Sequence, residues 1–136
     1  MTLRIFPGWW VVAAVFHVLS AASGLIFYGL AVYLDALTDE QPFSTTSVSL
    51  ATSVFFIVAG VAGRVIAPII ETRDIRLVIA LGAVFGGASL AVLGTVDSLV
   101  ELYTVYVVLA LGFAMAGVLP ATTLVTRWFH GRRALA

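Results

Sequence analysis

Long apolar runs without charge alternate with short charged segments along the chain. Four runs of 20 or more residues lack Asp, Glu, Lys and Arg: Ile5–Leu34, Gln41–Gly63, Leu77–Val96 and Leu102–Thr126. A membrane-spanning helix needs about 20 apolar residues, and only helices or closed barrels satisfy their backbone polar groups inside a bilayer. Barrel strands alternate in polarity, whereas these runs are continuously apolar. The pattern predicts an all-α membrane protein with four transmembrane helices at approximately 8–34, 45–70, 76–96 and 100–128.

The composition agrees with a lipid bilayer as the main partner. Hydrophobic residues make up 62% of the chain and charged residues 10%, whereas soluble domains carry about 25% charged residues. The absence of cysteine excludes disulfides and thiolate metal sites. No nucleophile–base pair, metal-ligand spacing or phosphate loop is present. We therefore expect no enzyme activity, no metal, no cofactor and no nucleic-acid partner.

The arginines all fall on one side of the membrane once four spans are assumed, together with Glu71 and Asp74. One side of the membrane receives all seven arginines, namely Arg4, Arg64, Arg73, Arg76, Arg127, Arg132 and Arg133. The other side receives only acids, namely Asp35, Asp39, Glu40, Asp97 and Glu101. Cytoplasmic loops carry the Lys/Arg excess. The sequence therefore predicts an integral protein of the cell (inner) membrane with a cytoplasmic N-terminus.

A polar stripe lies on the first predicted helix. At helical spacing His17, Ser20, Gly24 and Tyr28 share one face, and polar groups at membrane depth are costly and often functional. His17, with Ser20 and Tyr28, is a candidate to line a substrate path or to take up a proton, because histidine titrates near physiological pH. The alternative is a neutral histidine bonded to a neighbouring helix.

Arg64, near the end of the second predicted helix, is another candidate. It shares a small and polar face with Ser49, Ser53 and Gly60. In one interpretation Arg64 attracts an anionic substrate, because a guanidinium binds a carboxylate through two hydrogen bonds. In the other, its side chain extends to the cytoplasmic interface or pairs with Glu71.

Small residues recur four positions apart in the last two predicted helices. The pairs are Gly82 with Gly86, Gly87 with Ala91, Gly112 with Ala116, and Gly117 with Ala121. Such pairs let helix backbones approach closely. Pro120 is expected to kink the fourth helix, because it removes a backbone hydrogen bond.

Several segments, in order, resemble a known transporter family. They include Gly8-Trp9-Trp10-Val11-Val12, Gly112 and Pro120 in the fourth helix, and Arg127-Trp128-Phe129-His130-Gly131-Arg132-Arg133-Ala134-Leu135-Ala136. Together they are similar to the first four helices of major facilitator superfamily transporters, in particular the monocarboxylate and oxalate/formate-antiporter-like members. The resemblance implies the first part of an N-terminal six-helix bundle that moves a small organic anion by alternating access. Protons are one candidate for the coupling ion, which the sequence does not name.

The loop between the second and third helices also resembles the superfamily's Gly-x-Leu-Ala-Asp-Arg-x-Gly-x-Arg motif. Glu71 occupies the position of the acid and Arg76 that of the last basic residue, while Thr72 and Asp74 replace other motif residues. In the family this loop forms a charge network that closes the cytoplasmic side. The resemblance therefore implies a gate role for Glu71 and Arg76, and a weaker one for Arg73.

Two functions from different classes remain at this point. In the first, the chain is the start of a twelve-helix secondary transporter, truncated where Ala134-Leu135-Ala136 opens a fifth helix. In the second, it is a complete small four-helix membrane protein that acts as an oligomeric structural or regulatory subunit. A polar C-terminal tail would favour the second, and an apolar ending favours the first.

Overall fold

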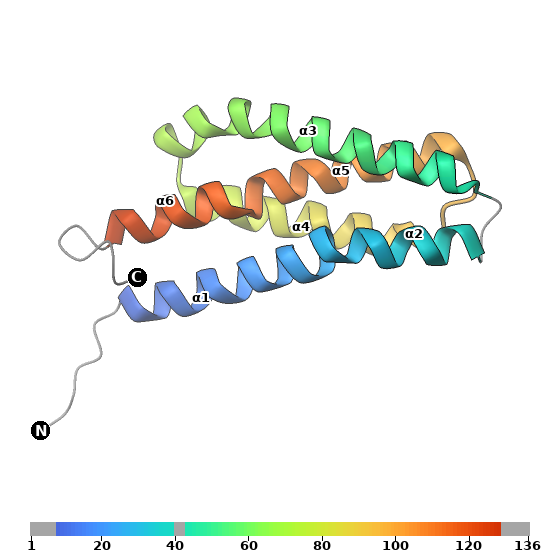
Figure 1. The fold of residues 1–136 in the computed structure, drawn as a ribbon. Helices are drawn as coiled ribbons and strands as arrows, with labels where there is room; N and C mark the ends of the chain where they lie inside the picture. Colours follow the sequence, from blue (N-terminus) through green and yellow to red (C-terminus); the bar gives the residue numbers. More distant parts are fainter. Residues whose placement is uncertain (1–7, 40–42, 129–136) are drawn as a thin grey trace, which may run out of the picture.

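The computed structural model describes residues 8–39 and 43–128, and within these ranges every regular element is a helix. The first long helix consists of α1 (Gly8–Ala21), a π-helical segment (Ala22–Tyr28) and α2 (Gly29–Asp39). It is followed by α3 (Thr45–Thr72), α4 (Ile75–Leu93), α5 (Leu99–Ala116) and α6 (Val118–Trp128). These elements form an antiparallel bundle (Figure 1).

Four helical stretches are long and apolar enough to cross a membrane. They are Gly8–Asp39, Thr45–Thr72, Ile75–Leu93 and Leu99–Thr126. The predicted all-α membrane architecture with four spans is confirmed at this level. The first helix extends to Asp39 and so includes part of the segment expected to be a loop after residue 34. Charge marks where a chain can leave the apolar core of a bilayer, but it does not end a helix.

Side-chain caps define where α3, α4 and α5 begin. Ser44 Oγ accepts a hydrogen bond from the Ser47 amide at 3.2 Å, Asp74 Oδ1 from the Arg76 amide at 3.0 Å, and Ser98 Oγ from the Glu101 amide at 3.3 Å. Each cap satisfies an amide that has no partner within the first turn of a helix. The caps therefore make sharp starts possible after short turns.

The antiparallel arrangement separates the described charges to opposite ends of the bundle (Figure 1). Asp35, Asp39, Asp97 and Glu101 lie toward the end where α2 finishes and α5 begins, and Arg73 and Arg76 lie at the turn from α3 to α4. Arg127, at the end of α6, belongs to the same end as Arg73. Arg4, Glu40, Arg132, Arg133 and Ala134–Ala136 are outside the described residues.

The closest helix contact joins α4 to α5. A Cβ atom added to Gly112 would lie 2.6 Å from the Gly86 amide nitrogen, and one added to Gly82 would lie 2.7 Å from the Ala116 amide nitrogen. The backbones therefore touch where the small-residue pairs predicted it. Gly87 is different, because an added Cβ would have no neighbour within 4 Å.

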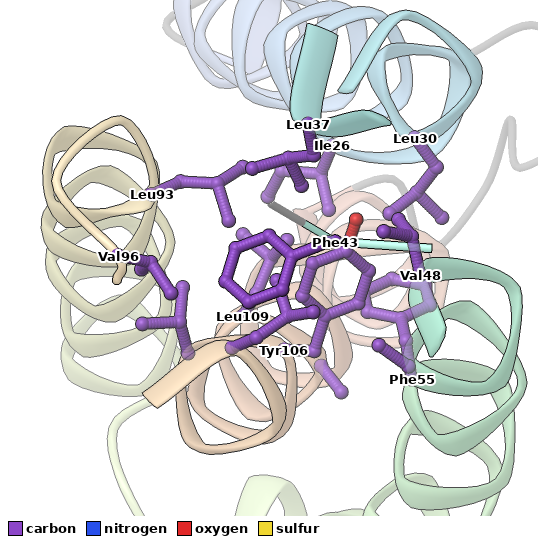
Figure 2. Close-up of a cluster of buried hydrophobic side chains, with 14 residues drawn as sticks. Ile26, Leu30, Leu37, Phe43, Val48, Phe55, Leu93, Val96, Tyr106 and Leu109 are labelled. Carbon is purple, nitrogen blue, oxygen red and sulfur yellow. The ribbon is translucent and has the colours of Figure 1, made fainter. Parts of the chain in front are cut away.

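The largest cluster of buried side chains lies between the second half of the first long helix, α3, the end of α4 and α5 (Figure 2). Tyr106 and Phe55 are fully buried at its centre, with Leu109 and Val48 beside them. A second, smaller cluster joins α3 to the start of α4 through Ile66, Ile70 and Ile75 and neighbouring residues. The two clusters hold both halves of α3 against the rest of the bundle.

The fourth spanning helix is interrupted between α5 and α6. Gly117 has an extended conformation (φ −80°, ψ −159°), and Pro120 follows inside α6. Proline removes one backbone hydrogen bond and its ring crowds the carbonyl four residues earlier, here that of Ala116. The chain meets this constraint by breaking the helix at Gly117, three positions before the proline.

Candidate functional site

A cavity of about 330 Å³ lies between the first long helix and α4. His17, Ala21 and Leu25 are part of one wall, and Ala83, Gly86 and Gly87 are part of the other. The α4 wall carries little side-chain volume, so the space between the two helices stays open. Among the described residues that line it, His17 alone has a titratable side chain. Its imidazole is therefore the main polar feature of an otherwise apolar cavity.

The hydrogen bond of His17 determines which ring atom is available. Its Nδ1 lies 2.8 Å from the Ala13 carbonyl oxygen, and because a carbonyl only accepts, Nδ1–H is the donor. In the neutral ring Nε2 is then the acceptor. The bond is made within the first long helix. One interpretation of the sequence expected a bond to a neighbouring helix instead. Nε2 remains able to accept a hydrogen bond from a ligand.

A second cavity, of about 250 Å³, adjoins the first. It is lined by Arg76, Ala14, Ala121 and Leu124, among others, and shares Val18 and Ala83 with the His17 cavity. We call the two together the His17–Arg76 groove. The structure thus places the exposed side chains of His17 and Arg76 in two adjoining cavities that share lining residues.

The other predicted path residues do not line this groove. Ser20 is exposed, and Tyr28 is 71% exposed with its ring edge-on to Phe27. The π-helical segment between Ala22 and Tyr28 changes the helical phase, so the stripe expected from uniform α-helical spacing does not stay on one face. Arg64 is exposed on α3, away from the groove.

The predicted gate residues lie at the turn from α3 to α4. Glu71, Arg73 and Arg76 are all exposed there, and among the described residues none of them forms an ion pair. The Arg73 amide donates to the Ile69 carbonyl at 2.9 Å and so closes α3. Asp74, at a position where the family motif has glycine, caps α4. The motif segment thus makes a tight turn, and its role as a gate remains a prediction.

Sequence reasoning missed two features of the packed structure. Arg76 was assigned to the gate alone, although it also lines the groove. In addition, the hydroxyl of the fully buried Tyr106 has no hydrogen-bond partner among the described residues, and Figure 2 shows it directed toward Leu30 and Val48. Neither feature has a local signal, because both depend on which helices pack together.

Comparison with known proteins adds no assignment, because no protein family, curated protein or solved structure matches this chain. Within residues 8–39 and 43–128, no group of three or more His, Cys, Asp or Glu side chains could hold a metal ion. Function must therefore be argued from the groove itself.

Proposed function

We propose that these four helices belong to a secondary transporter that moves a small organic anion, such as a monocarboxylate or dicarboxylate, across the membrane. The observation that carries the proposal is the His17–Arg76 groove, in which one permanent cation and one titratable ring line an otherwise apolar path. Ligand sites in proteins are typically apolar concavities of about 300–1,000 Å³ with a few polar groups that orient the ligand. The His17 cavity, at about 330 Å³, is near the lower end of that range and the adjoining cavity, at about 250 Å³, is just below it, which suits a small solute.

The chemistry of the two side chains favours an anion. The Arg76 guanidinium can bind a carboxylate through two parallel hydrogen bonds, and the alanine and valine side chains around it accommodate a short hydrocarbon body. A carboxylate that moves from the Arg76 cavity into the His17 cavity would lose its contact with the Arg76 guanidinium. Protonation of His17 on Nε2 supplies a second positive charge in the next cavity. Anion and proton then occupy the groove together, which makes protons the coupling ion.

The resemblance to major facilitator transporters supports alternating access as the mechanism. In such transporters two bundles rock about a shared site near the middle of the membrane. Within the proposal, the four helices are the first part of one bundle, with the Arg76 end at the cytoplasmic side. Glu71 and Arg76 would form the cytoplasmic gate in one of the two states.

The test is uptake of labelled lactate, formate and oxalate by proteoliposomes that contain the whole transporter polypeptide. Arg76→Gln should raise KM about tenfold or more, because a hydrogen bond to a charged group contributes about 1.5–3 kcal/mol. The exposed Arg73 does not line the groove, so Arg73→Gln is the matched control. Equal KM values for the two variants would remove Arg76 from the path.

The role of His17 has a separate signature. His17→Ala should flatten the dependence of uptake on pH between about pH 5 and 8. Ser20 is also polar and lies on α1, but it does not line the groove, so Ser20→Ala should keep the wild-type profile. If His17→Ala retains both the rate and the pH profile, the imidazole has only a packing role.

A second candidate function is an oligomeric structural or regulatory subunit. It is favoured by Gly24, Gly60 and Gly87, since a Cβ added at any of them would meet nothing within 4 Å, and open glycines on a spanning helix allow another helix to approach. Crosslinking in native membranes would distinguish the two functions. A stable oligomer without uptake of any of the three anions would favour the subunit.

A further inference from the structure

The first long helix contains seven consecutive residues, Ala22–Tyr28, in π-helical conformation. Extended π-helical stretches are rare, and most π-helix in proteins occurs as single turns, frequently near functional sites. Both flanking residues, Ala21 and Gly29, have right-handed α-helical dihedral angles. The helix therefore does not end at this segment, and its hydrogen-bond pattern changes from i→i+4 to i→i+5 and back.

The return to the α-helical pattern leaves one carbonyl without a helical partner. With the π-helical segment ending at Tyr28, the last i→i+5 bond runs from the Gly29 amide to the Gly24 carbonyl. The helix is α-helical again from Gly29 onward, and in that pattern the Leu30 amide pairs with the Ile26 carbonyl. The Leu25 carbonyl is skipped. Inside a bilayer such a group finds no water and needs another donor.

Tyr33 supplies that donor. Its hydroxyl donates to the Leu25 carbonyl oxygen at 2.6 Å, across eight residues of the same helix. The ring reaches back along the helix over Gly29, where an added Cβ would lie only 2.8 Å from the ring and its oxygen. Gly29 thus leaves the space through which Tyr33 passes, and the tyrosine spans the end of the π-helical segment.

The position of this bond links it to the groove. Leu25 and Ile26 line the His17 cavity, and His17 and Val18 lie on the same helix before the π-helical segment. One skipped carbonyl corresponds to one residue of helical register, which is about 100° of rotation at 3.6 residues per turn. If the segment became α-helical, α1 would turn by about this angle relative to α2, and His17 and Val18 would leave the groove.

We infer that Tyr33 is a positioning residue that holds the first long helix in its π-helical register, and thereby keeps His17 and Val18 in the groove. Breaking the bond between Tyr33 and Leu25 releases the register and rotates α1. Gly29 is part of the same device, because any larger residue displaces the tyrosine ring. The inference concerns the register of the helix and does not depend on the proposed transport function.

Cysteine crosslinking tests the register, since the chain contains no cysteine of its own. One pair, at Val18 and Ala83, joins the groove walls before the π-helical segment. The other pair, at Leu37 and Leu93, joins two residues of the main core cluster after it. Both are measured with a short bifunctional thiol reagent, in the protein embedded in lipid bilayers.

Tyr33→Phe and Gly29→Ala should each lose the crosslink at Val18–Ala83 and keep the one at Leu37–Leu93. Tyr103→Phe is the control, because Tyr103 also donates to a backbone carbonyl, that of Ser47 at 3.3 Å, away from the π-helical segment. It should keep both crosslinks. If Tyr33→Phe keeps both crosslinks, or loses both, Tyr33 does not set the register.

Discussion

Replacement of Gly112 by alanine is expected to destabilise the bundle, because the α4–α5 contact has no room for a methyl group. The added Cβ would lie 2.6 Å from the Gly86 nitrogen and 2.9 Å from the Gly82 carbonyl oxygen. Both are backbone atoms and cannot rotate away, so the two helices must separate by several tenths of an ångström. Overpacking of this kind costs about 1–3 kcal/mol.

Gly87→Ala is the matched control. An added Cβ at Gly87 meets nothing within 4 Å, and the helix-propensity gain of alanine over glycine, about 0.8–1 kcal/mol, is common to both variants. The difference between them therefore isolates the packing cost of about 1–3 kcal/mol. Gly86→Ala should fall between the two, because its Cβ would meet only the flexible end of Ile26, at 3.1 Å.

SDS-driven unfolding in mixed micelles provides the measurement. A single cysteine introduced at Ala110, which is fully buried, reports unfolding through its reaction with a thiol reagent. Gly112→Ala should unfold at a lower SDS fraction than Gly87→Ala. Equal midpoints, or a higher one for Gly112→Ala, would show that α4 and α5 do not pack backbone to backbone.

Three further predictions concern orientation, gating and the core. Cysteines introduced at Asp39 and Ser98 should react with an impermeant external thiol reagent in intact cells, and one at Thr72 should not; labelling at Thr72 from outside would reverse the orientation. Glu71→Gln in the proposed transporter should shift the resting population toward the inward-open state, and unchanged accessibility on both sides would exclude Glu71 from a gate. Tyr106→Phe should leave stability unchanged or raise it by about 1 kcal/mol, because it removes a buried hydroxyl without a partner; a loss of stability in SDS titration would show that the hydroxyl is satisfied.

The sequence by itself determined the number of spans, the helical class and the separation of charge. These follow from local properties, namely the length of each uncharged run and the residues between the runs. The close approach of the helices at Gly82 and Gly112 could also be predicted, because small-residue pairs act through a simple spacing rule.

The helix phase was decided by the structure. A uniform α-helical period placed Tyr28 on the same face as His17, but the π-helical segment changes the register between these two residues. The segment is accompanied by the Tyr33 hydrogen bond and the space over Gly29. A helical wheel drawn from the sequence assumes one uniform period along the helix. It therefore cannot represent a hydrogen bond between residues eight positions apart.

The composition of the groove also required the tertiary structure. Arg64 and Arg76 are both arginines near the same end of the bundle, and nothing local distinguishes them as groove residues. Arg76 lies on α4, which is one wall of the groove, whereas Arg64 lies on α3 and does not line the groove. Which helix packs against which depends on contacts between distant segments, so the packed bundle determines which cation lies near His17.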